Sequence, residues 1–129
     1  MKKIALTLLF SLSLLHAQDE MLRETPYAIV KQTLAKGKPI FVEAGSDSCH
    51  SCQIMGKTLY KIAKKHPSYN INFVNVKKER EAAFALKIQM IPTQLIFNKQ
   101  GKEVYRHVGI LAPEQVEALL KVHEFATIK

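Results

Sequence analysis

The sequence predicts an α/β domain in which a four-stranded mixed sheet carries helices on both faces. Three observations lead to this prediction. The chain has 129 residues, which suits one domain. Its hydrophobic residues alternate between strand-like runs and helix-like spacings, in the order α, β, α, β, α, β, β, α. Its composition, 47% hydrophobic and 23% charged, is that of ordinary globular proteins, which excludes collagen, coiled coils and wholesale disorder.

The N-terminal segment has the anatomy of a secretory signal peptide. Two lysines are followed by an apolar run over 4–15, and Ala17 offers a small residue for cleavage. The run is shorter than the roughly 20 residues that span a membrane, although an uncleaved anchor is the alternative. We therefore expect a signal peptide at 1–17 and a mature domain at 18–129. Losing the two lysines lowers the net charge from +8 to +6.

The first half of the mature chain is predicted to contain two helices and two strands. A helix is expected over 26–35, followed by a strand over 39–44 whose continuous apolar run (PIFVEA) is typical of a strand buried on both faces. A second helix ends near Pro67, and a second strand covers 71–76. The second helix is predicted from apolar residues at spacings of three, four and three: Cys52, Met55, Leu59 and Ile62.

The second half is predicted to contain a short helix, a hairpin and a final helix. The short helix covers 79–86, and the hairpin joins strands over 93–97 and 103–108 through a four-residue loop. The last helix begins at Pro113 and keeps one apolar face as far as His123. A helix connects the first two strands, so they should be parallel, whereas the hairpin strands should be antiparallel.

The only two cysteines form a C-x-x-C motif, Cys49 to Cys52, directly after the first strand and at the start of a helix. Three residues of helix place both sulfurs on one face. At the helix N-terminus, free N–H groups and the helix dipole favour the thiolate of Cys49. Cys52 lies one turn further into the helix, so we expect it to be the buried resolving thiol. A structural disulfide or a pair of inert thiols is the alternative. Haem attachment requires a histidine where Gln53 stands, and zinc lacks two further ligands, so we expect neither metal nor cofactor.

Over about residues 27–125 the sequence resembles the thioredoxin family, through the C-x-x-C motif, the run Ile91-Pro92-Thr93 before a strand, and Val108-Gly109 at the end of the hairpin. The resemblance implies a thioredoxin fold and a cis bond before Pro92, opposite the cysteines. It also implies that Ile91, Pro92, Thr93 and Gly109 bind an extended substrate segment.

Glu43 lies six residues before Cys49, where thioredoxins carry a buried aspartate. A carboxylate within an apolar strand needs a function or a partner. We interpret Glu43 as the general base that takes the proton of Cys52 through a water molecule. The alternatives are a position at the solvent-facing end of the strand or an ion pair with a lysine.

The sequence departs from the family between and around the cysteines. Ser48 replaces the usual aromatic residue, and His50-Ser51 replaces Gly-Pro. We expect His50 and Ser51 to tune the thiolate, with a protonated imidazole making the pair more oxidising. A solvated histidine without redox effect is the alternative for His50.

These features predict an enzyme, a thiol–disulfide oxidoreductase that acts in the bacterial periplasm as a monomer. Ile91 before the proline is similar to the reducing thioredoxins, so we expect a reductase of secreted disulfide proteins or apocytochrome c, recharged by a membrane thiol-reductant electron donor. A dithiol oxidase and a non-catalytic peptide-binding module are the alternatives.

Four lysines lie on the side of the second helix away from its apolar residues: Lys57, Lys61, Lys64 and Lys65. We interpret them as a solvated helix face, so we do not expect nucleic acid binding.

Overall fold

The computed structural model describes residues 20–126, so the predicted signal peptide at 1–17 lies outside the described residues. No helix within 20–126 is long and apolar enough to cross a membrane. The elements follow the predicted order. They are α1 (Tyr27–Thr33), β1 (Ile40–Gly45), α2 (His50–Lys65), β2 (Asn70–Asn75), α3 (Arg80–Ala85), β3 (Thr93–Phe97), β4 (Glu103–Val108) and α4 (Pro113–Val122).

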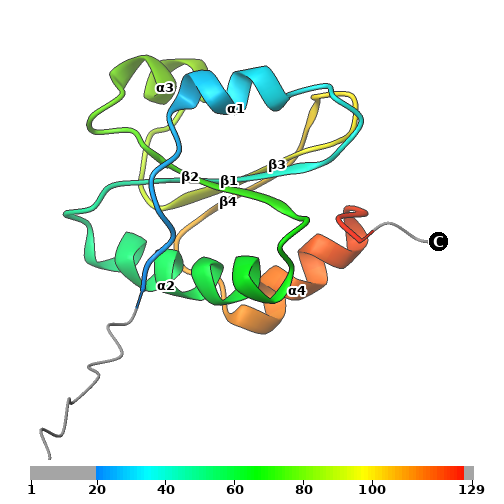
Figure 1. The fold of residues 1–129 in the computed structure, drawn as a ribbon. Helices are drawn as coiled ribbons and strands as arrows, with labels where there is room; N and C mark the ends of the chain where they lie inside the picture. The colour runs from blue at the N-terminus through cyan, green and yellow to red at the C-terminus, as the bar shows by residue number, and fades with distance from the viewer. Residues whose placement is uncertain (1–19, 127–129) are drawn as a thin grey trace, which may run out of the picture.

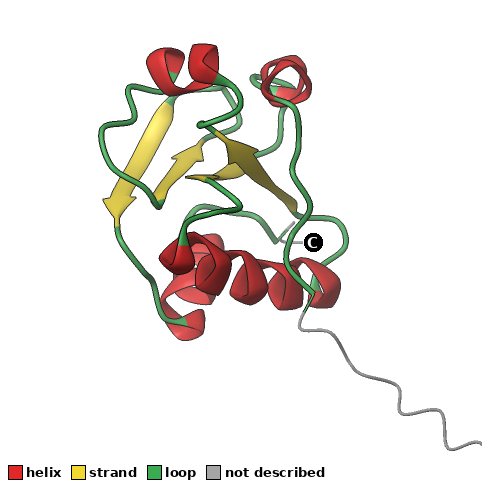
Figure 2. Ribbon diagram, turned by 90° about the vertical axis from the view of Figure 1, so that its left-hand side faces the viewer, coloured by secondary structure: helices red, strands yellow, loops and turns green. Residues whose placement is uncertain are grey.

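The four strands form one mixed sheet in the order β2-β1-β3-β4. β1 and β2 are parallel, as the intervening helix predicted, and β3 is antiparallel to both β1 and β4. Helices α1 and α3 cover one face of the sheet, and α2 and α4 cover the other (Figures 1 and 2). The predicted thioredoxin fold is therefore confirmed, including helices on both faces.

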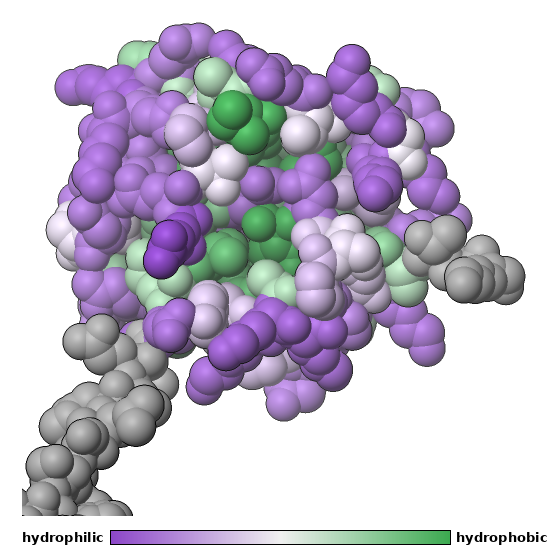
Figure 3. Space-filling view, viewed as in Figure 1, coloured by the Kyte–Doolittle hydropathy of each residue, from purple (hydrophilic) through white to green (hydrophobic). Residues whose placement is uncertain are grey.

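The core of the described residues consists of two apolar clusters, one on each face of the sheet. Because side chains alternate along a strand, β1 contributes to both: Val42 packs in the α1/α3 cluster and Phe41 in the α2/α4 cluster. In the face shown in Figure 3, hydrophobic residues gather in the middle, between borders of hydrophilic residues. This distribution is expected of helices whose outer faces are solvated.

Some element boundaries differ from the sequence prediction. Helix α1 ends at Thr33, because Leu34 is extended and Ala35 has a positive φ. Helix α4 ends at Val122, so the predicted extension through His123 is wrong: His123 caps the helix, and the next residue is left-handed. Strand β1 begins and ends one residue later than predicted and β2 one residue earlier, and the two pair in register from Ile40 with Asn70 to Gly45 with Asn75.

An N-terminal strap, residues 20–25, crosses α2 and the edge of the sheet (Figure 1). The Leu22 N–H donates to the Gly56 carbonyl at 3.0 Å, and the Thr25 N–H donates to the Phe73 carbonyl at 2.7 Å. A side chain at Gly56 would collide with Met21 of the strap. Gly56 thus lets the strap lie directly on the helix that carries the cysteines.

Candidate active site

The two cysteines lie at the start of α2, where Cys49 is the N-cap and Cys52 is in the first turn. They form a disulfide, with their Cα atoms 5.1 Å apart. Cys49 is half-buried, whereas Cys52 is fully buried. The Cys52 N–H donates to the Cys49 sulfur at 3.3 Å. A negative charge that formed on Cys49 would therefore meet a backbone donor at the positive end of the helix dipole.

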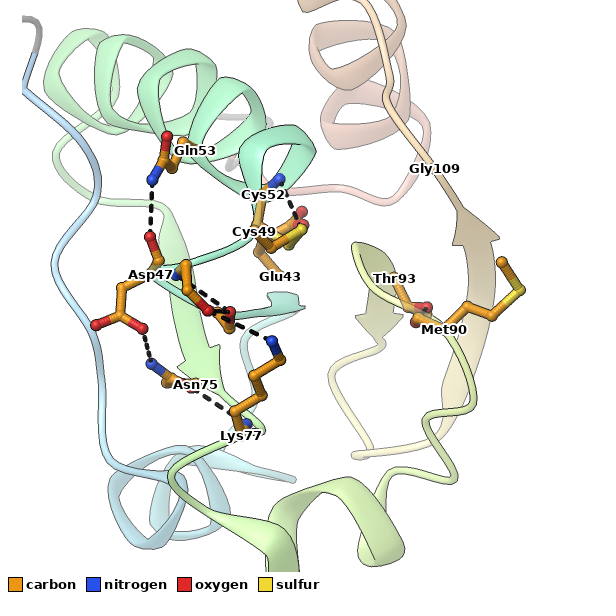
Figure 4. The surroundings of a disulfide bond; sticks show 12 residues. Glu43, Asp47, Cys49, Cys52, Gln53, Asn75, Lys77, Met90, Thr93 and Gly109 are labelled. Carbon is orange, nitrogen blue, oxygen red and sulfur yellow. Dashed lines mark hydrogen bonds between the residues drawn. A yellow bond between two sulfur atoms is a disulfide. The ribbon is translucent and has the colours of Figure 1, made fainter.

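A polar network holds the loop between β1 and α2 (Figure 4). The Ser48 N–H donates to the Ser46 hydroxyl at 3.2 Å. The Asn75 side chain donates to the Asp47 carboxylate at 3.1 Å, and the Lys77 ammonium donates to the Ser48 hydroxyl at 3.4 Å. Hydrogen bonds from Lys78 and Asn75 hold the pKa of the Asp47 carboxyl below its usual value. These hydrogen bonds, which the sequence did not reveal, hold residues 46–48, the segment that leads into Cys49.

Glu43 is fully buried on the α2/α4 face of the sheet. Two residues further along the same face of β1, a side chain built on Gly45 would meet the Cys52 sulfur at 3.1 Å, so this face of the strand lies beneath the cysteines. Burial raises the pKa of Glu43 to about 8, and a hydrogen bond from Gln94 offsets part of that rise. Both alternatives for Glu43 are thus wrong: it is fully buried and not at a solvent-facing end, and within residues 20–126 its side-chain partner is Gln94 and not a lysine.

The predicted substrate-binding residues lie together at the beginning of β3 and the end of β4. The Ile91–Pro92 peptide bond is cis, as the resemblance implied. The Gly109 N–H donates to the Pro92 carbonyl at 2.8 Å, and its φ of +106° is one that L side chains rarely adopt. The Thr93 hydroxyl donates to the Met90 carbonyl at 2.6 Å, which orders the loop before the strand. Figure 4 shows Thr93 and Gly109 on one side of the disulfide, with Asp47 and Lys77 on the other.

The two residues between the cysteines differ in exposure. His50 is the first residue of α2 and is exposed, whereas Ser51 is half-buried. The structure therefore places the His50 side chain in solvent beside Cys49. Its effect on the redox pair stays a prediction.

Gln94 and His107 were not identified from the sequence. Gln94 is fully buried in β3 and its side-chain nitrogen donates to both oxygens of Glu43, at 3.1 and 3.3 Å. His107 in β4 lies 2.7 Å from the Gln94 side-chain oxygen. The alternation of side chains along the strand could have identified Gln94. A glutamine within an otherwise apolar central strand needs a buried hydrogen-bond partner, and Glu43 is the buried polar side chain of β1 that pairs with it in register.

The chemistry that this arrangement supports is thiol–disulfide exchange. An attacking sulfur requires a helix N-terminus or a similar donor, and a resolving sulfur requires disulfide-bonding distance; Cys49 and Cys52 meet these requirements. The buried carboxyl on the same face has the chemistry that a proton acceptor requires. Among residues 20–126, no group of three or more His, Cys, Asp and Glu side chains is placed to hold a metal ion.

Comparison with known proteins gives the same family. The model of the family described as "Thioredoxin-like domain" matches residues 26–123. A thioredoxin of Mycoplasmoides gallisepticum is 27% identical over 97 residues, covering 75% of this chain and 96% of that protein. The mitochondrial thioredoxin of Mus musculus is 32% identical over 84 residues, 64% of this chain and half of that protein.

Solved structures show the same fold. A mutant thioredoxin from Halobacterium salinarum matches with a TM-score of 0.70 at 17% identity, covering 86% of this chain and 96% of that one. The thioredoxin of Fasciola hepatica matches with a TM-score of 0.68 at 25% identity, covering 80% and 99%. The family match contains both cysteines and nearly all the described residues, so the chain belongs to the thioredoxin-like domain family and is a thiol–disulfide oxidoreductase.

Proposed function

We propose that this oxidoreductase works in the bacterial periplasm as a reductase of disulfides in secreted proteins, including misoxidised proteins and apocytochrome c. The Cys49 thiolate attacks a substrate disulfide, which forms a mixed disulfide and releases one substrate thiolate. The Cys52 thiolate then attacks the Cys49 sulfur, which releases the second substrate thiolate. Two electrons pass to the substrate, the Cys49–Cys52 disulfide remains, and a membrane thiol donor reduces it again.

The observation that carries the direction of the reaction is the buried carboxyl of Glu43 beneath the cysteines. An ionised Glu43 disfavours a negative charge on the cysteine sulfurs above it. The apolar surroundings of Glu43 also disfavour such a charge, and they do so at any pH. Strongly oxidising dithiol proteins depend on a stabilised thiolate in their reduced form. Burial thus favours a reducing pair, whereas the helix N-terminus favours an oxidising one. In this proposal Glu43 is the base that accepts the proton of Cys52.

Exposed apolar residues around the site suit the capture of an extended substrate segment. Ile54 in α2, Met90 before the cis bond and Ile110 after Gly109 are 39%, 64% and 48% exposed. Each follows or precedes a site residue closely in the chain. We propose that these side chains contact the substrate while the backbone at Ile91 pairs with it as a strand would.

Mixed-disulfide trapping tests the roles of the cysteines. Cys52→Ser should accumulate mixed disulfides with substrates through Cys49, whereas Cys49→Ser should lose disulfide reduction. The products are separated on non-reducing gels and identified by mass spectrometry. Trapping through Cys52 in the Cys49→Ser protein would reverse the roles, and a double Cys-to-Ser variant that kept full activity in cells would favour the peptide-binding module.

The reduction potential tests the direction. We expect equilibration against glutathione to give a value in the lower half of the range between thioredoxin, about −270 mV, and a strong oxidant, about −120 mV. A potential above about −150 mV would replace the reductase by the dithiol oxidase. Cell fractionation with N-terminal sequencing tests the location, with Gln18 as the expected first residue of the mature protein.

A further inference from the structure

Three polar side chains from three neighbouring strands form a row beneath the redox pair. Glu43 of β1 pairs in register with Gln94 of β3, and Gln94 pairs in register with His107 of β4. The Gln94 nitrogen lies 3.1 and 3.3 Å from the Glu43 oxygens, and the Gln94 oxygen lies 2.7 Å from Nδ1 of His107. Glu43 and Gln94 are fully buried, whereas His107 is half-buried at the edge of the sheet.

The hydrogen bonds determine which way the Gln94 amide points. Its oxygen can only accept, so Nδ1 of His107 carries the hydrogen of that bond. Its nitrogen has two hydrogens, which the Glu43 carboxyl and the Gly109 carbonyl both accept, the latter at 2.9 Å. The reversed amide would set its oxygen against the Gly109 carbonyl oxygen. The Gly109 carbonyl therefore keeps the donor end of Gln94 aimed at Glu43, and the matching Nδ1–H form of His107 holds the oxygen end.

Gln94 also connects Glu43 to the substrate-binding loop. The Gly109 carbonyl accepts from Gln94, and the Gly109 N–H donates to the Pro92 carbonyl at 2.8 Å. One glutamine amide thus contacts both the carboxyl beneath the cysteines and the glycine that holds the cis-proline loop.

Few other titratable groups within residues 20–126 face Glu43. Helix α2 presents the two cysteines, which are disulfide-bonded here, and β2 presents the apolar Phe73 in register. From β3 and β4 come Gln94 and, through it, His107. No lysine or arginine within 20–126 forms an ion pair with Glu43, and burial and the Gln94 hydrogen bond account for the shift of its pKa. Burial is the larger of the two causes, and Gln94 is the side chain among the described residues that favours the carboxylate against it.

We propose that Gln94 and His107 are positioning residues of the reaction: Gln94 stabilises and orients the Glu43 carboxylate, and His107 fixes the orientation of the Gln94 amide. This inference rests on the proposed role of Glu43 as the base for Cys52. Without the Gln94 donor, the buried carboxylate would lose its only side-chain hydrogen bond among the described residues. Without the His107 donor, the Gln94 oxygen would lose its partner, and the amide would be held less firmly.

The test measures Glu43 directly, by following its carboxyl carbon by NMR through a pH titration of the oxidised protein. Gln94→Leu should move the midpoint of Glu43 upward by about one pH unit, because a hydrogen bond to a charged group is lost. His107→Phe should move it upward by about half as much, since Gln94 remains but is less well oriented. His107→Asn supplies an amide donor near the position of Nδ1 and should restore the original midpoint. Gln94→Met replaces Gln94→Leu if the latter does not fold.

The pH profile of disulfide reduction separates positioning from packing. The profile of Gln94→Leu should move upward with the Glu43 midpoint, which lowers turnover at pH 7 about tenfold and restores it at high pH. A packing defect would lower turnover equally at every pH. An unchanged Glu43 midpoint in Gln94→Leu, or a His107→Asn protein that behaves like His107→Phe, overturns this inference alone. A midpoint that moves without the rate profile overturns the base role of Glu43 and the inference with it.

Discussion

Two neighbouring cross-strand pairs at the centre of the sheet have opposite chemical character. Val42 pairs with Leu95, and one residue further along, Glu43 pairs with Gln94. All four side chains are fully buried, and strand alternation sends the first pair toward α1 and α3 and the second toward α2 and α4. The same two strands thus build an apolar contact on one face and a polar one on the other.

The difference shows where this fold gives up stability for chemistry. Burying the apolar pair stabilises the protein by roughly 2 kcal/mol for each side chain. Burying the Glu43 carboxyl opposes its ionisation, which is why its pKa rises to about 8. The polar pair lies on the face that carries the cysteines, where the proposed reaction can use the buried carboxyl.

The largest expected effect tests the apolar pair. Leu95→Ala should destabilise the protein by about 3–5 kcal/mol, because it removes buried methyl groups and leaves a cavity between tightly packed strands. The reduction potential should stay within about 10 mV of the original value, since the α1/α3 cluster does not face the disulfide. Urea unfolding of the oxidised protein and a glutathione titration provide the measurements. A large shift in potential would contradict the separation of the two faces.

The second-largest expected effect comes from the polar pair and concerns how stability depends on pH. The usual pKa of 4.5 for Glu43 rises to about 8 in the folded protein, so the folded state holds this proton more tightly than the unfolded chain does. The associated stability is complete below pH 4.5 and is lost as the pH rises toward 8. Glu43→Gln removes this loss. The variant should gain about 3 kcal/mol relative to the original protein between pH 4 and pH 7, while disulfide reduction slows.

Urea unfolding at several pH values between 4 and 8 measures that gain. Glu81→Gln is the matched control, since Glu81 is exposed and pairs with Lys31 on the surface. Its pH dependence should change by no more than a few tenths of a kcal/mol. If the free energy of unfolding depended on pH in the same way in the two variants, Glu43 would have its usual pKa in the folded protein. Unchanged turnover of Glu43→Gln across pH 6–9 would remove its role as a base.

Most of the fold was predictable because its signals are local. The run PIFVEA located β1 to within one residue, and the four-residue loop after Phe97 identified the hairpin. Position within the helix also distinguished Cys49 from Cys52, since Cys49 is half-buried at the N-cap and Cys52 is fully buried. Helix ends were less accurate, because α4 ends at Val122, two residues before the left-handed residue Glu124, for which the periodicity gives no warning.

The polar row was not predictable in the same way, because it depends on register. Gln94 and His107 are 13 residues apart, and their contact follows from the alignment of β3 with β4. The contact of Gln94 with Glu43 requires β3 to lie antiparallel to β1, a pairing that no loop signal defines. Apolar pairs can be exchanged for one another with little cost, but a buried donor needs one particular acceptor. The structure therefore adds most where the site is polar.

The smallest expected effect extends the comparison from the buried pair to the exposed side of the site. His50 lies in solvent beside Cys49, so any charge it carries is surrounded by water and ions. A protonated imidazole there stabilises the Cys49 thiolate and makes the pair more oxidising. His50→Gly should therefore lower the reduction potential. A solvated charge changes the thiolate pKa by no more than about one unit, which is about 1.4 kcal/mol. For a two-electron couple this energy corresponds to about 30 mV, so the expected decrease is only about 20–40 mV.

Salt distinguishes this exposed contribution from the buried one. The Debye length falls from about 10 Å at 0.1 M salt to about 3 Å at 1 M, so the His50→Gly shift should shrink to a few millivolts at high salt. The shifted titration of Glu43, which is screened by protein instead of solvent, should stay the same at both concentrations. His123→Gln, at the end of α4, is the control and should leave the potential unchanged. A rise in potential on His50→Gly, or a shift that high salt does not reduce, would show that His50 acts through the structure of the start of α2 and not through its charge.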